Sequence, residues 1–547
     1  MSSRVRVVLG PPGTGKTTFI MGEIDRLLQA GVDPSEIGFY SFTRAACNEA
    51  KDRAATRFGF DPEGQEFTHW RTLHSQAYRL IGRDHGAVMK HEHWKELGEW
   101  ACLQFTDCDT MQSVDTFMLA SLATDGDKLR HVYDLMRLCK LSIDATLLRV
   151  GESGEMLSYD VIASFIQKYE TFKRDKKLLD FVDMLKIAAK TEKKPSIRYA
   201  YFDEAQDNCA LQAELVQRWA IDNPRCEETV IVGDDDQAIY VWSGAEPGIL
   251  IDYAGKHETR VLEQSYRIPA RVHGFAQRII AQNRARLPKV YRPRSEPGDM
   301  LFMSSPTSLF DSEDFDFDAR AKKPGGVMML CRNIMFAESL RNECLSRGRT
   351  FTCEVGEPSP LQSDTQRGAF LALSAILRRR PVRASGLIHA LDLIPTKDGG
   401  ERVLPHGVKA AAARNEGLVD EARLVGEFAL EPLLDRVRRL PNPFDVFAKL
   451  KAKERAYLDA VYRRDPNLSS GGKTTISSMH RSKGREASTV ILSPDCTSAT
   501  YRQVAAGDES ENRVAYVAAT RARDALVILH PTRRQHYDYE QFVGGQA

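Results

Sequence analysis

Gly10-Pro11-Pro12-Gly13-Thr14-Gly15-Lys16-Thr17-Thr18 lies between an apolar run at residues 5–9 and a segment whose apolar residues recur at helical spacing. Glycines in this pattern let backbone N–H groups wrap phosphate oxygens at the positive end of a helix. We expect the whole stretch to contact a nucleotide, with Lys16 at the β and γ phosphates and Thr17 holding Mg²⁺. The stretch therefore predicts a strand, a phosphate-binding loop and a helix.

Further short apolar, β-branched runs recur along the chain, with helical patterns between several of them. These expected strands are residues 37–42, 199–202, 229–232, 327–330, 475–479, 489–492 and 526–529. Alternation of strands and helices is typical of parallel α/β sheets. Residues from about 76 to 170 and from about 365 to 465 are dominated by helical patterns, so we expect both to be insertions into α/β lobes.

Composition limits the class of protein. A length of 547 residues predicts three to four domains, at roughly 150 residues per domain. Lys plus Arg total 76 and Asp plus Glu total 75, so a nucleic-acid partner must be held by locally arranged cations and not by overall charge. The ten cysteines include no Cys-x-x-Cys pair, and no apolar stretch reaches the length of a membrane helix. We expect reduced thiols, no membrane partner and a cytoplasmic location, or a nuclear one in a eukaryote.

Two adjacent carboxylates follow the expected strand at residues 199–202. Asp203 suits a metal ligand, and Glu204 suits a residue that activates water, because adjacent acids point in different directions. A pair of acids can also be an ordinary helix N-terminus. The upstream phosphate-binding loop favours the catalytic interpretation.

The strand at residues 229–232 leads into a polar amide, Gln237, and two aromatic residues, Tyr240 and Trp242. The amide suits a sensor of a γ-phosphate, and the aromatic rings suit stacking on nucleobases. The alternative is that both rings belong to the core or its rim.

The order of these segments resembles the UvrD/Rep type of superfamily 1 DNA helicases over most of the chain. The segments that carry the resemblance are GPPGTGKTT (10–18), FTRAACNEA (42–50), WRTLHSQAYRL (70–80), DEAQD (203–207), VGDDDQAIYVWSGA (232–245), LEQSYRIP (262–269), TISSMHRSKGREA (475–487) and ENRVAYVAATRAR (511–523). The resemblance implies an α/β fold with two RecA-like P-loop NTPase lobes, each carrying a mainly helical insertion. The expected lobes are residues 1–75 with 171–270, and 271–364 with 466–547; the expected insertions are 76–170 and 365–465.

Residue roles follow from the same resemblance. Besides Lys16 and Glu204, it implies that Gln237, Arg267 and Arg521 act at the γ-phosphate, the arginines neutralising charge that develops during phosphoryl transfer. Tyr266 would stack on adenine and Glu486 would approach the ribose. The expected single-strand path consists of Phe42, Thr43, Arg44, His74, Tyr240, Trp242 and His480. For His74 and His480 the alternative is a hydrogen-bonded structural histidine.

The implied activity is an ATP- and Mg²⁺-dependent motor that moves 3′ to 5′ on single-stranded DNA, binds single-strand/duplex junctions and separates duplex. Two alternatives remain open: a single-strand translocase that strips proteins without unwinding, and a nucleotide-gated switch that binds DNA without stepping. Absence of directional movement, with DNA binding intact, would favour the switch.

The sequence departs from the family pattern in three places. Only nine residues precede the phosphate-binding loop, so the segment that usually reads adenine is missing and we expect relaxed base selectivity. Ser243 stands where relatives often carry a basic residue, which removes one expected contact to the DNA backbone. The second insertion, about 100 residues, is small for the family, and it makes the protein-displacing alternative plausible.

Overall fold

The computed structural model describes residues 3–82, 85–106, 124–150, 157–398 and 400–543. The chain divides into two compact units. The first consists of residues 1–297 and 502–520, and the second of residues 298–501 and 521–547. Each unit is built around its own six-stranded parallel sheet.

The sheet of the first unit has the strand order β3-β2-β6-β7-β1-β8. Its strands are β1 (Arg4–Leu9), β2 (Ile37–Tyr40), β3 (Trp70–Arg71), β6 (Tyr199–Phe202), β7 (Glu228–Gly233) and β8 (Glu258–Val261). In β1, Val5, Val7 and Leu9 enter one apolar core and Val8 enters another, so both faces of the sheet are covered. Central strands buried on both faces explain the nearly continuous apolar runs in the sequence.

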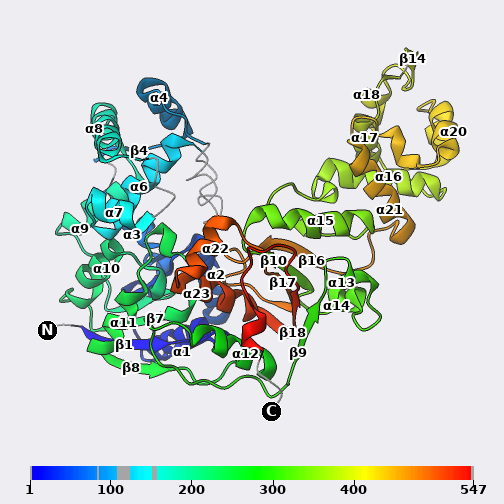
Figure 1. Cartoon of the computed structure of the whole chain (residues 1–547). Coiled ribbons are helices and arrows are strands. Elements are labelled where there is room, and N and C mark those ends of the chain that lie inside the picture. Colours follow the sequence, from blue (N-terminus) through cyan, green and yellow to red (C-terminus); the bar gives the residue numbers. More distant parts are fainter. Residues whose placement is uncertain (1–2, 83–84, 107–123, 151–156, 399, 544–547) are drawn as a thin grey trace. The chain divides into compact units, whose positions relative to one another are not determined.

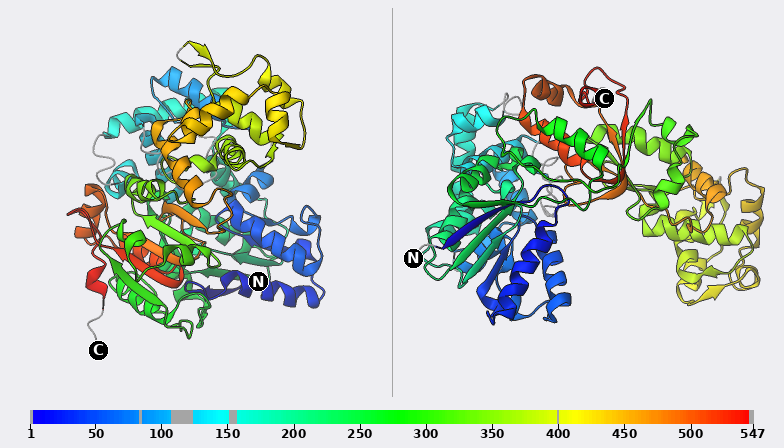
Figure 2. Two further views of the ribbon diagram at one scale, coloured as in Figure 1. Left: turned by 90° about the vertical axis from the view of Figure 1, so that its right-hand side faces the viewer. Right: turned by 90° about the horizontal axis from the view of Figure 1, so that it is seen from below.

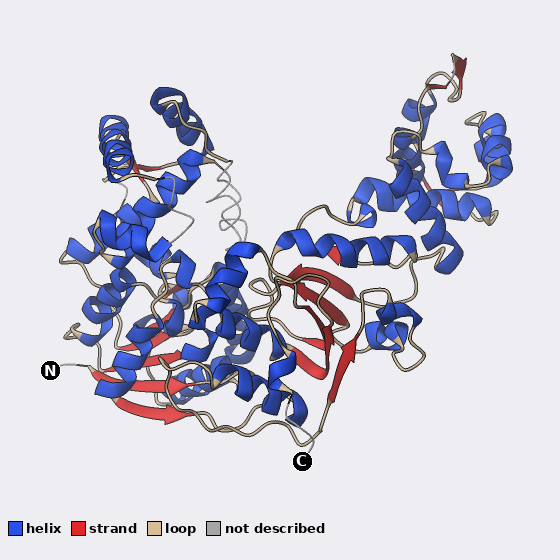
Figure 3. Ribbon diagram, in the orientation of Figure 1, coloured by secondary structure: helices blue, strands red, loops and turns tan. Residues whose placement is uncertain are grey.

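Helices cover the two faces of this sheet, as Figure 3 shows. They are α1 (Lys16–Gln29), α2 (Arg44–Phe58), α3 (Leu73–Ile81), α9 (Phe181–Lys190), α10 (Ala210–Val216) and α11 (Pro247–Lys256). Helices α12 (Ala270–Ile280) and α23 (Glu509–Ala519) belong to the same unit and pack against each other. Residues of α1 and α2 pack in one core, and residues of α3, α9 and α10 pack in the other. The sheet is therefore the middle layer of a three-layer unit.

A helical subdomain interrupts the first unit between α3 and α9 and stands away from its sheet (Figure 1). It contains β4 (Ala87–Val88), α4 (His91–Ala101), α6 (Asp125–Cys139), α7 (Ile143–Val150), α8 (Tyr159–Lys176) and β5 (Leu178–Leu179). Its helices share a separate apolar core that includes Trp94, Val132, Phe165 and Tyr169. Helices predominate in the described part of residues 76–170.

The sheet of the second unit has the order β11-β16-β10-β17-β18-β9. Its strands are β9 (Asp299–Met303), β10 (Val327–Cys331), β11 (Thr352–Cys353), β16 (Thr474–Ser478), β17 (Ala487–Ser493) and β18 (Ala522–Leu529). Every residue of β10 and β17 is buried. All seven strand runs expected from the sequence, in both units, are confirmed. Their ends agree with the observed strands within two residues, except that β18 begins four residues before the expected run.

Helices α13 (Ser308–Asp311), α14 (Phe317–Lys322) and α15 (Ala337–Ser346) belong to the second unit, and α22 (Ser498–Ala505) spans the boundary between the units. A second helical subdomain lies beyond α15, at the end of this unit away from its sheet (Figures 1 and 2). It contains α16 (Asp364–Leu377), β12 (Val382–Arg383), α17 (Ala384–Leu393), β13 (Lys397–Asp398), β14 (Glu401–Arg402), α18 (Val408–Ala413), β15 (Leu418–Val419), α19 (Glu421–Gly426), α20 (Glu431–Arg439) and α21 (Ala452–Arg464). Its apolar core continues into that of the sheet.

Among the described residues, no helix combines the length and the apolar character needed to cross a bilayer. Nine cysteines in the described part of the chain are free thiols, and eight of them are buried. Cys108 lies outside the described residues.

Candidate active site

The candidate site of the first unit begins where β1 ends. Gly13 and Gly15 adopt positive φ angles of 74° and 81°, a conformation that costs glycine little. A Cβ on Gly10 would lie 2.1 Å from Cγ of Lys16, so only glycine leaves room for the lysine stem there. The Lys16 ammonium donates to the Gly10 carbonyl at 3.2 Å. The loop therefore closes around the lysine at the N-terminus of α1.

Two acidic residues stand beside this lysine, at the end of β6. Lys16 Nζ lies 3.5 Å from Glu204 Oε1, and the Thr17 hydroxyl lies 3.4 Å from Asp203 Oδ2. Glu204 has a φ of 56°, a left-handed conformation that is uncommon for a residue with a side chain. This backbone turn directs two successive carboxylates to different partners.

The surroundings of Asp203 fit a divalent cation. Burial and the neighbouring Glu204 carboxylate raise the pKa of Asp203 to about 7, although Lys16 opposes the shift. A bound cation would relieve the cost of burying this carboxylate. The Asp203 carboxylate and the Thr17 hydroxyl supply the oxygen ligands that Mg²⁺ prefers.

Strand β7 lies between β1 and β6, and its end brings a third polar group into this region. Gly10 N donates to Gly233 O at 2.9 Å, so the phosphate-binding loop is joined directly to β7. The Gln206 amide nitrogen donates to Glu204, while its carbonyl oxygen accepts from Asp234 N at 2.9 Å. Gln237 is buried, and its Nε2 donates to Asp234 Oδ2 at 2.7 Å.

The segment after β8 packs against the phosphate-binding loop. Tyr266 N donates to Gly13 O at 2.8 Å, and the Ser265 hydroxyl donates to Pro12 O at 2.8 Å. Arg267 follows directly and lies against Gly13. Tyr266 is 70% exposed, although its backbone is hydrogen-bonded to Gly13. The unit therefore brings Arg267 and an accessible aromatic ring to the same loop as Lys16.

Aromatic residues cluster beside these groups. The rings of Phe42 and Tyr240 stack with centroids 5.6 Å apart, and Tyr240 meets Trp242 edge to face at 6.5 Å. His131, from the helical subdomain, lies 6.3 Å from the Trp242 ring. Three separate segments of the chain thus supply one aromatic cluster.

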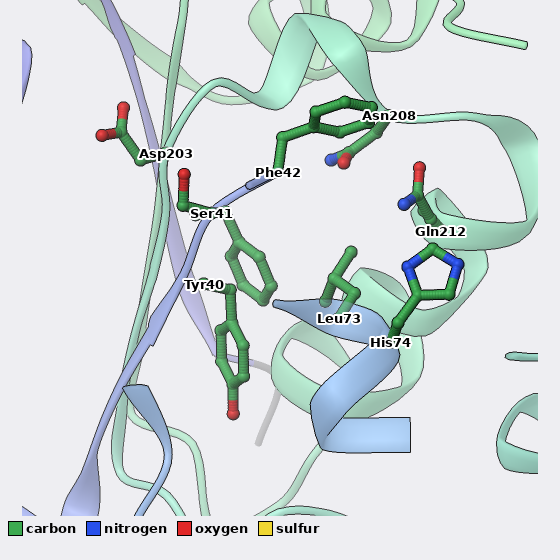
Figure 4. A pocket seen from close by; sticks show the side chains of 9 residues that line it. Tyr40, Ser41, Phe42, Leu73, His74, Asp203, Asn208 and Gln212 are labelled. Carbon is green, nitrogen blue, oxygen red and sulfur yellow. The ribbon is translucent and has the colours of Figure 1, made fainter. Parts of the chain in front are cut away.

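A small pocket extends between Asp203, of the acidic pair, and Phe42, of this cluster (Figure 4). Its lining includes Asp203 at one side and Phe42 and His74 at the other. Packing around the His74 imidazole, with a smaller contribution from Arg44, lowers its pKa to about 4. The Thr43 hydroxyl accepts from Ala46 N at 3.1 Å and caps α2, which Arg44 begins.

The remaining predicted residues belong to the second unit. Arg521 is 1% exposed, and one of its guanidinium nitrogens donates to the Arg485 carbonyl at 3.4 Å. The Glu486 carboxylate forms an ion pair with Arg523 at 2.9 Å. His480 is buried, and this burial lowers its pKa well below the ordinary value. Their roles at the nucleotide and on the strand path stay predictions.

Several residues of the site were not predicted from the sequence. Ser265 and Gln206 lie inside segments that were quoted, but neither was assigned a function. His131 lies in the helical subdomain, where no local pattern marks it as a neighbour of Trp242. For Ser265 the signal was its place directly before Tyr266 and Arg267.

The chain is similar to known proteins over most of its length. The model for the UvrD/REP helicase N-terminal domain matches residues 2–258, and the model for the UvrD-like helicase C-terminal domain matches residues 454–532. The ATP-dependent DNA helicase UvrD2 of Mycobacterium tuberculosis is 26% identical, over 99% of this chain and 79% of the relative. The ATP-dependent DNA helicase Rep of Escherichia coli is 26% identical over 53% of this chain and 42% of its own length. The ATP-dependent DNA helicase PcrA of Leuconostoc citreum is 24% identical over 56% and 41%.

Proposed function

This chain belongs to the UvrD/Rep family of ATP-dependent superfamily 1 DNA helicases, and we propose that it is a motor that steps 3′ to 5′ along single-stranded DNA and separates the duplex ahead of it. The observation that carries the proposal is the convergence of Lys16, Glu204 and Arg267 on one loop in the first unit. The polarity and the separation of duplex rest on family membership.

In the proposed site, Lys16 binds the β and γ phosphates within the loop of residues 10–18. Thr17 and Asp203 hold Mg²⁺, which supplies positive charge at the phosphate oxygens. Glu204 orients the attacking water and accepts its proton. The 3.5 Å separation of Lys16 and Glu204 supports this division of roles, because a phosphate bound by Lys16 would lie beside the Glu204 carboxylate.

Gln237 and Arg267 in the first unit and Arg521 in the second are proposed to contact the γ-phosphate. Cations at this position stabilise the charge that develops during phosphoryl transfer. Tyr266 is proposed to stack on the base and Glu486 to approach the ribose. The exposed ring of Tyr266, anchored through its backbone to Gly13, supports the stacking role.

The strand is proposed to pass over the aromatic cluster of Phe42, Tyr240 and Trp242. Stacking tolerates every base, since each base has a π-face, so the path should show little sequence preference. Thr43, Arg44, His74 and His480 complete the proposed path. The pocket that joins Asp203 to Phe42 and His74 supports a close connection between nucleotide and strand.

ATP hydrolysis with single-stranded DNA, duplex DNA or RNA, measured with all four nucleoside triphosphates, tests the proposal. We expect stimulation by single-stranded DNA, and its loss in Lys16→Ala and Glu204→Gln while strand binding persists. Lys190→Ala and Glu192→Gln, at exposed positions outside the site, are the matched controls. Hydrolysis at the normal rate by either site variant would contradict the assignment.

One observation favours a second function, a single-strand translocase that displaces proteins without unwinding. The Ser243 hydroxyl donates to the Tyr240 carbonyl at 2.9 Å, within its own turn. Ser243 therefore does not replace the basic residue that relatives often carry here for a contact to the DNA backbone. A strand-displacement assay run beside a protein-displacement assay distinguishes the two functions. Protein removal without strand separation would favour the translocase.

A further inference from the structure

Three consecutive aspartates follow β7, and one buried lysine meets all of them. The Lys289 side chain is 1% exposed, and its ammonium lies 3.2 Å from Asp234 Oδ1, 2.5 Å from Asp235 Oδ1 and 3.0 Å from Asp236 Oδ2. None of the three carboxylates is more than 1% exposed. Lys289 lies more than fifty residues beyond them in the chain, in a stretch that carries none of the segments discussed so far.

Neighbouring groups complete this charge cluster. The Arg286 guanidinium donates two hydrogen bonds to the Asp236 carboxylate, at 2.8 Å and 2.6 Å. Leu287 N donates to Asp235 Oδ2 at 2.8 Å. Arg513, on α23, donates to the Asp235 carbonyl at 3.1 Å and to the Ala285 carbonyl at 2.7 Å. Segment 285–289 is thereby fixed between the triple aspartate and α23.

Charges buried this deeply are stable only when they are paired. Burial alone would lower the pKa of Lys289, but the three carboxylates outweigh burial and raise it above its ordinary value. The lysine is therefore a permanent cation. Removing it would leave carboxylates without compensation in a region that excludes water.

Asp234 connects this charge cluster to Gln237, the residue proposed to contact the γ-phosphate. One oxygen of this carboxylate accepts from Gln237 Nε2 at 2.7 Å, and the other faces Lys289 at 3.2 Å. Movement of the Gln237 amide away from Asp234 and toward a γ-phosphate would remove this hydrogen bond. A buried acceptor that loses a partner costs roughly 1–3 kcal/mol unless another donor remains.

We propose that Lys289 is a positioning residue for ATP hydrolysis, which keeps Asp234 compensated when the Gln237 amide moves from Asp234 to the γ-phosphate. This inference rests on the proposed function, because it takes Gln237 as the sensor of that phosphate. Without the lysine, the uncompensated carboxylate would hold the amide more strongly. We then expect a slower hydrolysis step and little change in the affinity for ATP.

Steady-state ATP hydrolysis by Lys289→Met tests the proposal, with thermal unfolding as a check on the fold. We expect kcat to fall by about tenfold or more while KM for ATP stays within about threefold. Lys289→Arg keeps the charge and should recover most of kcat.

Arg286→Gln is the matched control, because it removes a comparable ion pair that serves Asp236 and leaves Asp234 with Lys289. A purely structural role for the cluster predicts similar losses in Arg286→Gln and Lys289→Met. The proposal predicts a kcat defect in Lys289→Met alone. Equal defects, or an unchanged kcat in folded Lys289→Met, would overturn it.

The double variant Asp234→Asn/Lys289→Met keeps the proposal testable if the single variant does not fold, because it removes one buried charge of each sign. We expect the double variant to hydrolyse ATP faster than Glu204→Gln, because no carboxylate remains at position 234 to hold the Gln237 amide. A double variant as inactive as Glu204→Gln would overturn the inference. Hydrolysis of ATP by Lys16→Ala would contradict the proposed function. Wild-type behaviour of Lys289→Met, with Lys16→Ala inactive, would contradict only the positioning role of Lys289.

Discussion

Gly13 and Arg267 approach so closely that a methyl group on Gly13 would lie 2.4 Å from the Cβ of Arg267. The phosphate-binding loop and the segment after β8 therefore fit together only while residue 13 lacks a side chain. The backbone hydrogen bond from Tyr266 to Gly13 fixes the same contact.

Gly13→Ala is expected to displace Arg267 and to strain a backbone with positive φ. We expect DNA-stimulated ATP hydrolysis to fall by about tenfold or more, because a cation that stabilises transferring charge acts only when it is well placed. Gly22→Ala is the control, since that glycine lies inside α1 with open space around it. Normal hydrolysis by folded Gly13→Ala would show that Arg267 does not need this contact.

Tyr266→Ala is expected to weaken the binding of the nucleotide base. Base–aromatic stacking contributes about 1–3 kcal/mol, so KM for ATP should rise by about fivefold or more while kcat changes less. Tyr266→Phe keeps the ring and should behave as wild type. Running the four nucleoside triphosphates in parallel measures base preference, and an unaltered KM in Tyr266→Ala would count against stacking.

Phe42→Ala is expected to reduce affinity for single-stranded DNA without abolishing ATP binding. Phe42 and Tyr240 stack on each other, so loss of one ring also removes support from the second. We expect a loss of about 1–3 kcal/mol, measured by fluorescence anisotropy with a labelled oligonucleotide. Tyr159→Ala removes an exposed ring elsewhere in the first unit and is the control. Equal affinities of the two variants would place the strand elsewhere.

His131 is expected to contribute to unfolding at acidic pH. Burial, with a smaller contribution from Arg130, lowers its pKa to about 4, below the ordinary value of about 6.5 for the unfolded chain. The unfolded state then binds the proton more readily, so stability is lost as the pH falls from about 6.5 to about 4, by up to about 3 kcal/mol.

Urea unfolding of His131→Gln at several pH values measures this contribution. The loss of stability on acidification should be smaller in His131→Gln than in wild type. His91→Gln, at an exposed position on α4, should follow the wild-type curve. Parallel curves for His131→Gln and wild type would exclude His131 as a source of acid sensitivity.

The central strands could be predicted because burial on both faces demands continuous apolar runs, as in β10 and β17. Strands β3 and β11 could not, because two residues carry no periodicity. The exposed pattern of β8 gave no apolar signal either. Local sequence therefore identified the interior of each sheet and missed parts of its edges.

Some residues of the candidate site could likewise be predicted from local sequence, and others could not. Lys16, Asp203 and Glu204 could be predicted because each group follows a recognisable strand: the phosphate-binding loop follows β1, and the two acids follow β6. Lys289 and Arg513 act on the triple aspartate from positions more than fifty and more than two hundred residues away, so no local pattern reports them. Only the folded chain brings these cations to the carboxylates.

Helix α23 belongs to the first unit, although the strands that precede and follow it in the chain belong to the second. The polypeptide thus crosses between the units three times. During synthesis, the hydrogen bonds of Arg513 to Asp235 and of Tyr516 to Tyr291 can form only after the segment 502–520 has been made. A chain truncated after residue 297 would lack Arg513, the donor to the Asp235 carbonyl, so the first unit is complete only when residues 502–520 are present.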